Sequence, residues 1–218
     1  MRVGVLALQG DFAAHAKALE AAASSAGMAA SLALVRRPRD LEGLAGLAMP
    51  GGESTTLLNL LADEGLDEAI VSFARSGGSI LATCAGAILL SKVVTNPEQR
   101  SLGLLDATIE RNSYGRQVDS FVGEAKVTAA GKGLLGDGAI PAVFIRAPRF
   151  LSVGPGVEVL ATEGADAVLV REGNVMALTF HPELSGDLRV QRAFLEGAAA
   201  SSALRAASGG LAVAATRS

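Results

Sequence analysis

In the first half of the chain, short apolar runs alternate with helical patterns. Residues 3–8 form a run with no charged position, as expected for a strand buried on both faces of a sheet. Further strands are predicted at 31–35, 46–49 and 79–83, and helices at 12–25, 54–63, 66–75 and from 85 to about 93. Strand and helix alternating at this spacing are typical of a parallel sheet with right-handed crossovers.

The second half has a different pattern, in which apolar runs follow one another across short turns such as Gly154-Pro155-Gly156. Strands are predicted at 107–110, 121–128, 142–146, 157–162, 167–171 and 175–180, and a last helix at 187–199. These strands are expected to pair antiparallel, at the sheet edge or as a small extra sheet.

The predicted fold class is therefore α/β, with three layers: a mainly parallel central sheet, helices on both faces, and antiparallel additions in the second half. Residues 1–199 are interpreted as one domain. Residues 200–218 are rich in Ala, Ser and Gly and are interpreted as a low-complexity tail, irregular or helical in part, without chemistry of its own.

Composition excludes several classes of function. The 218 residues are 50% hydrophobic and 19% charged, which fits a folded domain with a full core. A formal charge of −3 and only 4% aromatic residues argue against a nucleic-acid or anionic-membrane partner. A single cysteine cannot form a disulfide within the chain. One cysteine and two histidines are also too few ligands for an ordinary structural zinc site. With no secretory signal or apolar run of about 18 residues apparent, the protein is expected to be cytoplasmic.

The single cysteine, Cys84, lies between the predicted strand 79–83 and the helix that follows it directly. Ligands of open α/β sheets bind at the carboxyl ends of the strands, and a helix amino terminus favours thiolate over thiol. The small neighbours Ala82 and Gly86 allow so sharp a turn to close. This is the pattern of a nucleophile elbow with sulfur in place of oxygen, although a lone cysteine is more often a small buried apolar residue.

A cysteine nucleophile needs a proton carrier, and His181 is the better placed histidine because it follows the apolar run 175–180. Pro182 favours an extended conformation for the residue before it, and residues two apart in an extended chain point to the same side. His181 and Glu183 are therefore predicted to pair, with the carboxylate fixing one tautomer of the imidazole. His15 lies on the predicted first helix and is interpreted as an ordinary surface residue.

The glycine-rich turn Pro50-Gly51-Gly52-Glu53-Ser54 follows the third predicted strand, at the same sheet edge as Cys84. Its backbone N–H groups suit a developing oxyanion or a phosphate. The phosphate interpretation is the weaker one, because the Lys of a full phosphate-binding loop is absent. The structural alternative is a plain turn with a Ser N-cap.

Taken together, these stretches resemble the class I glutamine amidotransferase family, and within it the glutaminase subunits of pyridoxal 5′-phosphate synthases. The Cys elbow and the later His-Pro-Glu are common to the wider class. The stretches specific to the subfamily are PGGEST at 50–55, RN..GRQ at 111–117 and FIRAP at 144–148. The resemblance spans about residues 1–197 and implies a flavodoxin-like fold.

The resemblance also implies roles. Cys84 would be the nucleophile, with His181 and Glu183 completing a triad, and the N–H groups of Gly52 and Ala85 would form an oxyanion hole. The positions that match the family's L-glutamine site are Gly51, Gly52, Glu53, Arg111, Ile145 and Arg146. The implied reaction is hydrolysis of L-glutamine to L-glutamate and ammonia through a glutamyl thioester, without metal or organic cofactor.

The implied partner is the barrel subunit of pyridoxal 5′-phosphate synthase, in a hetero-oligomeric ring that uses the ammonia for vitamin B6 biosynthesis. The first helix, with Gln9 and His15, is expected to face that partner. The sequence departs from the family pattern at Ala82, where Gly is usual, at Ser113-Tyr114, where Ala-Phe is common, and in the longer tail. Because Ala is small, activity is expected to survive the first change.

Three alternatives stay open at this point. An amidotransferase subunit serving another synthase would share the triad. An elbow-cysteine hydrolase or peptidase would not need Glu53, Arg111 and Arg146 together. A flavodoxin-like binding module would carry a buried, inert Cys84.

Overall fold

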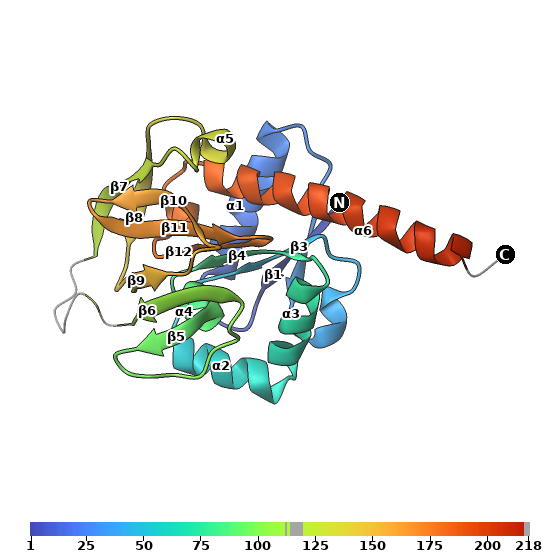
Figure 1. Cartoon of the computed structure of the whole chain (residues 1–218), viewed down its shortest axis with the longest axis horizontal. Helices are drawn as coiled ribbons and strands as arrows, with labels where there is room; N and C mark the ends of the chain where they lie inside the picture. Colours follow the sequence, from blue (N-terminus) through green and yellow to red (C-terminus); the bar gives the residue numbers. More distant parts are fainter. Residues whose placement is uncertain (112, 114–119, 216–218) are drawn as a thin grey trace.

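The computed structural model of the chain describes residues 1–111, 113 and 120–215, with described side chains ending at residue 207. It shows three layers, in which helices cover both faces of a twisted central sheet (Figure 1). The predicted fold class is confirmed.

The main sheet, in the part of the chain that the structure describes, has nine strands in the order β2-β1-β3-β4-β12-β11-β10-β7-β8. Its parallel half consists of β1 (Arg2–Leu6), β2 (Ser31–Val35), β3 (Gly46–Met49), β4 (Ser79–Thr83) and β12 (Val175–Leu178). Its antiparallel half consists of β7 (Phe121–Val127), β8 (Ala139–Phe144), β10 (Glu158–Glu163) and β11 (Asp166–Glu172). All residues of β3, β4 and β12 are buried, which explains why these strands lack a polar alternation.

A second sheet of three strands contains β5 (Ser91–Thr95), β6 (Leu105–Glu110) and β9 (Arg149–Val153). Both expected placements of the later strands occur, at one side of the main sheet and in a small extra sheet. The expected antiparallel pairing holds only in part, because β12 pairs parallel with β4 inside the main sheet and β6 pairs parallel with β5. Strand β5 corrects the prediction of a helix to about residue 93, because α4 (Ala85–Leu90) ends before it. The hydroxyl of Ser91 donates to the carbonyl of Ala87, and the β-branched residues that follow favour a strand.

Helices α1 (Phe12–Ser25) and α6 (Arg189–Ala215) cover one face of the main sheet, and α2 (Ser54–Asp63), α3 (Leu66–Arg75) and α4 cover the other (Figure 1). Each face has its own apolar cluster, the first including Leu19 and Phe194 and the second Leu57 and Ile70. Short helical turns complete the described elements: η1 (Pro38–Leu41), α5 (Lys132–Leu135) and η2 (Pro182–Leu184).

Helix α6 is longer than the predicted 187–199 and continues to Ala215, into the segment interpreted as a tail. Two contacts hold its extension near the body of the domain. The Ser201 Oγ lies 3.2 Å from the Ser79 Oγ, and the Arg205 Nη2 donates to the carbonyl of Leu44 at 3.0 Å. Among the described helices, none has the length and apolar character needed to cross a bilayer.

Candidate active site

The order of the parallel strands brings three turns together at the carboxyl edge of the sheet. Strand β4 lies between β3 and β12, with Met49 beside Ala82 and Leu178 beside Thr83. In this register the three strands end at nearly the same level of the sheet. The turns that carry Gly51, Cys84 and His181 therefore converge, although they come from distant parts of the sequence.

Cys84 occupies the sharp turn between β4 and α4, with φ 49° and ψ −106°. Its backbone N–H donates to the carbonyl of Leu178 at 2.9 Å, which ties the turn to the neighbouring strand. A Cβ at Gly86 would lie 2.6 Å from the Met49 carbonyl oxygen, so the turn needs a residue without one there. Ala82, the departure from the family pattern, is completely buried beside this turn.

Cys84, His181 and Glu183 lie side by side at this edge of the sheet. The His181 Nδ1 lies 2.7 Å from the Glu183 Oε1, and the same imidazole interacts with Cys84. Burial works against the charged imidazolium, but the bonds to Cys84 and Glu183 outweigh it and hold the pKa of His181 well above its ordinary value. An imidazolium beside a cysteine is the kind of neighbour that activates a sulfur nucleophile.

A cavity of about 340 Å³ opens over this group. All six positions predicted to bind glutamine line it: Gly51, Gly52, Glu53, Arg111, Ile145 and Arg146. At its floor, a Cβ on Gly51 would lie 2.6 Å from the His181 Cε1 and 3.1 Å from the Cys84 Cβ. A larger and more open depression of about 710 Å³ lies beside α3, but Cys84 does not line it.

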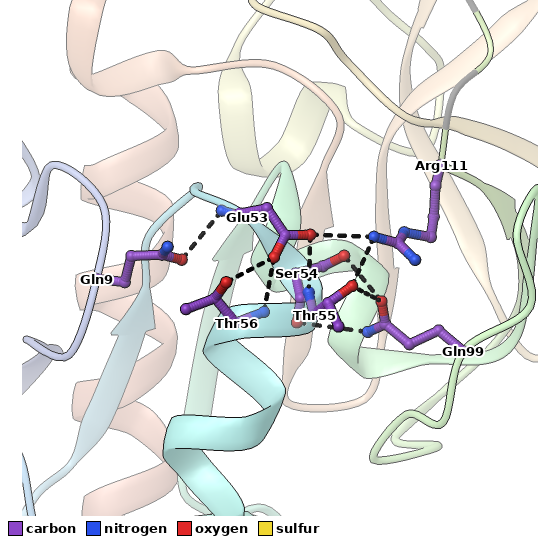
Figure 2. A network of polar contacts seen from close by, with 7 residues as sticks. All are labelled: Gln9, Glu53, Ser54, Thr55, Thr56, Gln99 and Arg111. Carbon is purple, nitrogen blue, oxygen red and sulfur yellow. Dashed lines mark hydrogen bonds and ion pairs between the residues drawn. The ribbon is translucent and has the colours of Figure 1, made fainter.

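Glu53 and Arg111 place opposite charges at one wall of the cavity (Figure 2). The Arg111 Nη2 donates to the Glu53 Oε1 at 3.1 Å and to the Thr55 Oγ1 at 2.9 Å. Glu53 also caps helix α2 by accepting from the backbone N–H groups of Thr55 and Thr56. Burial opposes the charged carboxylate, but these donors outweigh it and lower the pKa of Glu53 to about 2.

Two glutamines that sequence reasoning did not assign to the site flank the segment that carries Glu53 (Figure 2). The Gln9 Oε1 accepts from the backbone N–H of Glu53 at 3.0 Å. The Gln99 Oε1 accepts from the hydroxyls of Ser54 and Thr55 at 3.0 and 3.3 Å. No local motif marked Gln99, because its partners are more than 40 residues away in the sequence.

The other predicted positions lie close to the nucleophile. The Ile145 carbonyl oxygen is 4.0 Å from the Cys84 Sγ. Arg146 lines the cavity with φ 44°, and Ala85 is the completely buried first residue of α4. In the rest of the predicted RN..GRQ stretch, Ser113 is described, whereas Asn112, Tyr114, Gly115, Arg116 and Gln117 lie outside the described residues.

His15 is not a surface residue, and this part of the prediction is wrong. Its side chain is 2% exposed, and its Nε2 lies 3.1 Å from the Glu183 Oε1. A signal for this was present in the sequence. His15 continues the buried stripe of Ala18, Leu19, Ala22 and Ala23, whose helical spacing puts all five on the sheet-facing side of α1.

Comparison with known proteins decides between the open alternatives. The model of the SNO glutamine amidotransferase family matches residues 5–200. The chain belongs to the SNO glutamine amidotransferase family. It is therefore an enzyme of the glutamine amidotransferase class, and neither an inert binding module nor a peptidase.

Curated relatives of this SNO-family chain carry the name pyridoxal 5′-phosphate synthase subunit PdxT. The protein of Thermotoga maritima is 46% identical over 196 residues, 90% of this chain and 98% of the relative. The protein of Deinococcus radiodurans is 48% identical over 200 residues, 89% of this chain and 96% of the relative.

Solved structures agree with this assignment. A crystal structure of a glutamine amidotransferase superimposes with a TM-score of 0.79 at 47% identity, covering 90% of this chain and 98% of the other. The structure of PurLQS from Thermotoga maritima, at 19% identity and a TM-score of 0.65, covers 89% of this chain and 97% of the other. This second likeness shows the fold alone.

Proposed function

We propose that the chain hydrolyses L-glutamine to L-glutamate and ammonia with Cys84, His181 and Glu183, and delivers the ammonia to the synthase subunit of a pyridoxal 5′-phosphate synthase. One observation carries the chemical part of the proposal: Cys84 and the hydrogen-bonded pair of His181 and Glu183 line the same cavity as Glu53 and Arg111. The name shared by the curated relatives supports the identity of the partner.

The wall of the cavity suits the head of the substrate. Free glutamine carries an α-carboxylate and an α-ammonium, and an Arg guanidinium binds a carboxylate with charge-assisted hydrogen bonds. Arg111 would hold the carboxylate and Glu53, ionised at neutral pH, the ammonium. This leaves the side-chain amide to reach the floor of the cavity, beside Cys84 and Gly51.

In the first half of the reaction, the Cys84 thiolate attacks the amide carbon. The oxyanion that forms accepts hydrogen bonds from the backbone N–H groups of Gly52 and Ala85. Imidazolium His181 gives its proton to the amide nitrogen, the C–N bond breaks, and ammonia leaves. The product on the enzyme is a γ-glutamyl thioester with neutral His181.

In the second half, His181 takes a proton from water, and the resulting hydroxide attacks the thioester carbon. The C–S bond breaks to give glutamate and to restore the thiolate–imidazolium pair. Glu183 holds the His181 ring in one orientation and stabilises the imidazolium in both halves.

The ammonia would be consumed by a barrel-shaped synthase subunit, in a ring of synthase subunits that each carry one copy of this chain. A direct test measures glutamate release from glutamine with and without that subunit. We expect release to rise when the subunit binds. No stimulation, together with no binding, would contradict the pairing while leaving the hydrolysis open.

The chemistry is tested separately with a chloroketone analogue of glutamine and peptide mass spectrometry. The reagent is expected to modify Cys84 rapidly at neutral pH, and free L-glutamine is expected to protect it. A chloroketone of similar reactivity without the amino-acid head serves as the control. Equal labelling by both reagents, without protection by glutamine, would argue against a glutamine site.

A further inference from the structure

Glu183 contacts a second imidazole besides that of His181. The His15 Nε2 lies 3.1 Å from the Glu183 Oε1, and the two side chains are each 2% exposed. The same oxygen receives the His181 Nδ1 at 2.7 Å. His15 comes from α1, and its position 168 residues before Glu183 explains why no local motif joins them.

The proton on His15 can be assigned from its neighbours. Burial works against ionisation of Glu183, but hydrogen bonds from His15 and His181 outweigh it and hold the pKa of Glu183 well below its ordinary value. A carboxylate only accepts hydrogen bonds, so the His15 Nε2 must carry a hydrogen. The Thr83 Oγ1, 3.2 Å from the same nitrogen, is a second acceptor for that hydrogen.

The two oxygens of Glu183 are used unequally. Oε1 accepts from both imidazoles, whereas Oε2 is buried and has no hydrogen-bond partner among the described residues. The orientation of the carboxylate therefore depends on the two N–H donors at one oxygen. Without His15, one donor is left, and a buried charge with fewer partners is driven to rotate or to recruit water.

We propose that His15 is a positioning residue of the hydrolytic site: its Nε2–H fixes the Glu183 carboxylate, which in turn orients His181 towards Cys84. This inference rests on the proposed Cys84 chemistry and adds a fourth side chain to it. Thr83, the last residue of β4 directly before Cys84, ties the same imidazole to the strand that carries the nucleophile.

His15 does not line the cavity, so its contribution differs from that of a substrate-binding residue. Loss of the Nε2–H should lower kcat, because the orientation of His181 matters in the bond-breaking steps. The KM for glutamine should stay close to that of the wild type, because Glu53 and Arg111 are untouched. A purely structural histidine would change thermal stability without this separation of kcat from KM.

Two substitutions whose side chains have similar length distinguish the loss of the hydrogen-bond donor from the loss of packing. In His15→Gln, the side-chain amide nitrogen takes the place of Nε2 and keeps a donor, whereas His15→Met fills similar space without one. Glutamate release is measured with the full chain in complex with the synthase subunit, and thermal unfolding is followed in parallel. If His15→Met does not fold, His15→Asn replaces it, because its shorter amide does not reach Glu183.

For His15→Met we expect kcat to fall about 10- to 100-fold, the range typical for outer partners that hold a functional histidine in place, with KM changed less than about threefold. His15→Gln should recover most of kcat. The proposal is overturned if the donor-free variant keeps kcat within twofold of the wild type, or if the Gln and donor-free variants lose kcat equally.

The same series distinguishes failure of this inference from failure of the proposed function. If wild-type complex releases no glutamate, or Cys84→Ala releases it at the wild-type rate, the hydrolytic proposal itself is wrong. If the wild type is active, Cys84→Ala is inactive and the donor-free His15 variant is unaffected, only the positioning role is wrong.

Discussion

The residue at position 84 has to meet one requirement with its side chain and another with its backbone. Its side chain must reach the cavity, and its backbone must turn directly from β4 into α4. The result is a φ of 49° with ψ −106°, a combination that side chains with a Cβ rarely adopt. Such a conformation costs about 1–3 kcal/mol and persists when its surroundings enforce it. Here the bonds from Cys84 N to Leu178 and from Ile88 N to Cys84 do so.

This strain predicts that a variant without a Cβ is more stable. Cys84→Gly and Cys84→Ala both remove the thiol, and only the first relieves the backbone. Gly also gives the unfolded chain more conformational freedom, which lowers the stability of the folded state by about 0.4–1 kcal/mol. The relief of backbone strain is expected to be larger than this loss. We expect Cys84→Gly to have the higher free energy of unfolding by about 1 kcal/mol in urea titrations. A Cys84→Ala variant of equal or greater stability would show that the turn is unstrained.

The residues of the proposed triad were accessible to sequence reasoning because each lies in a local pattern, a strand–helix elbow or a His-Pro-Glu. His15 was not recognised, because its contact with Glu183 joins two residues far apart in the sequence. Only its place in the apolar stripe of α1 pointed to burial. Gln99 shows the same limit, since a polar side chain in a loop has no pattern that reveals a partner.

The β3–α2 turn is the element that gives the site both its shape and its charge. Gly51 lets the backbone pass directly over His181 and Cys84, and Glu53 both caps α2 and faces Arg111. The glycine-rich pattern predicted this turn and its place at the sheet edge. It did not predict that Glu53 would be engaged by four donors, from Thr55, Thr56 and Arg111.

Gly51→Ala is expected to damage activity more than stability. The added Cβ would lie 2.6 Å from the His181 Cε1, so the imidazole must move, and displacements of about 1 Å can cost about 100-fold in rate. Gly197→Ala in α6 is the matched control, because its Cβ meets nothing within 4 Å. Full glutamate release by Gly51→Ala would contradict the placement of His181 beneath this turn.

The low pKa of Glu53 predicts how its contribution to stability depends on pH. Folding lowers this pKa from 4.5 to about 2, so the ionised form stabilises the fold above pH 4.5, and this contribution is lost as pH falls towards 2. In urea titrations, wild type should exceed Glu53→Gln in unfolding free energy at pH 6. The difference should shrink between pH 4.5 and 2. A difference independent of pH would rule out the charged cap as its cause.

At the scale of the whole molecule, the site and the start of the α6 extension lie at opposite ends of β4. The site follows the last residue of β4, whereas Ser201 contacts Ser79, the first residue of that strand. The parallel half of the sheet was predictable because each strand is a short apolar run. The extension of α6 was not, because its contacts with Ser79 and Leu44 span more than 120 residues.

This separation predicts that shortening α6 changes stability and leaves catalysis intact. A chain ending at residue 200, where the match to the family model also ends, loses the contacts of Ser201 and Arg205, whereas a chain ending at 207 keeps them. At about 0.5–1.5 kcal/mol per hydrogen bond, the shorter chain should be about 1–3 kcal/mol less stable. The two shortened chains should have the same kcat/KM for glutamine. A loss of activity in the shorter chain alone would mean that residues 201–207 serve the site.

The central claim is that the sulfur of Cys84 breaks the amide bond of glutamine. The most direct measurement is glutamate release by wild type and Cys84→Ala, each in complex with the synthase subunit and each shown to be folded by thermal unfolding. We predict that Cys84→Ala is at least ~10³-fold slower, because removing the nucleophile leaves only binding and oxyanion contacts. Release by Cys84→Ala within tenfold of wild type would contradict the account.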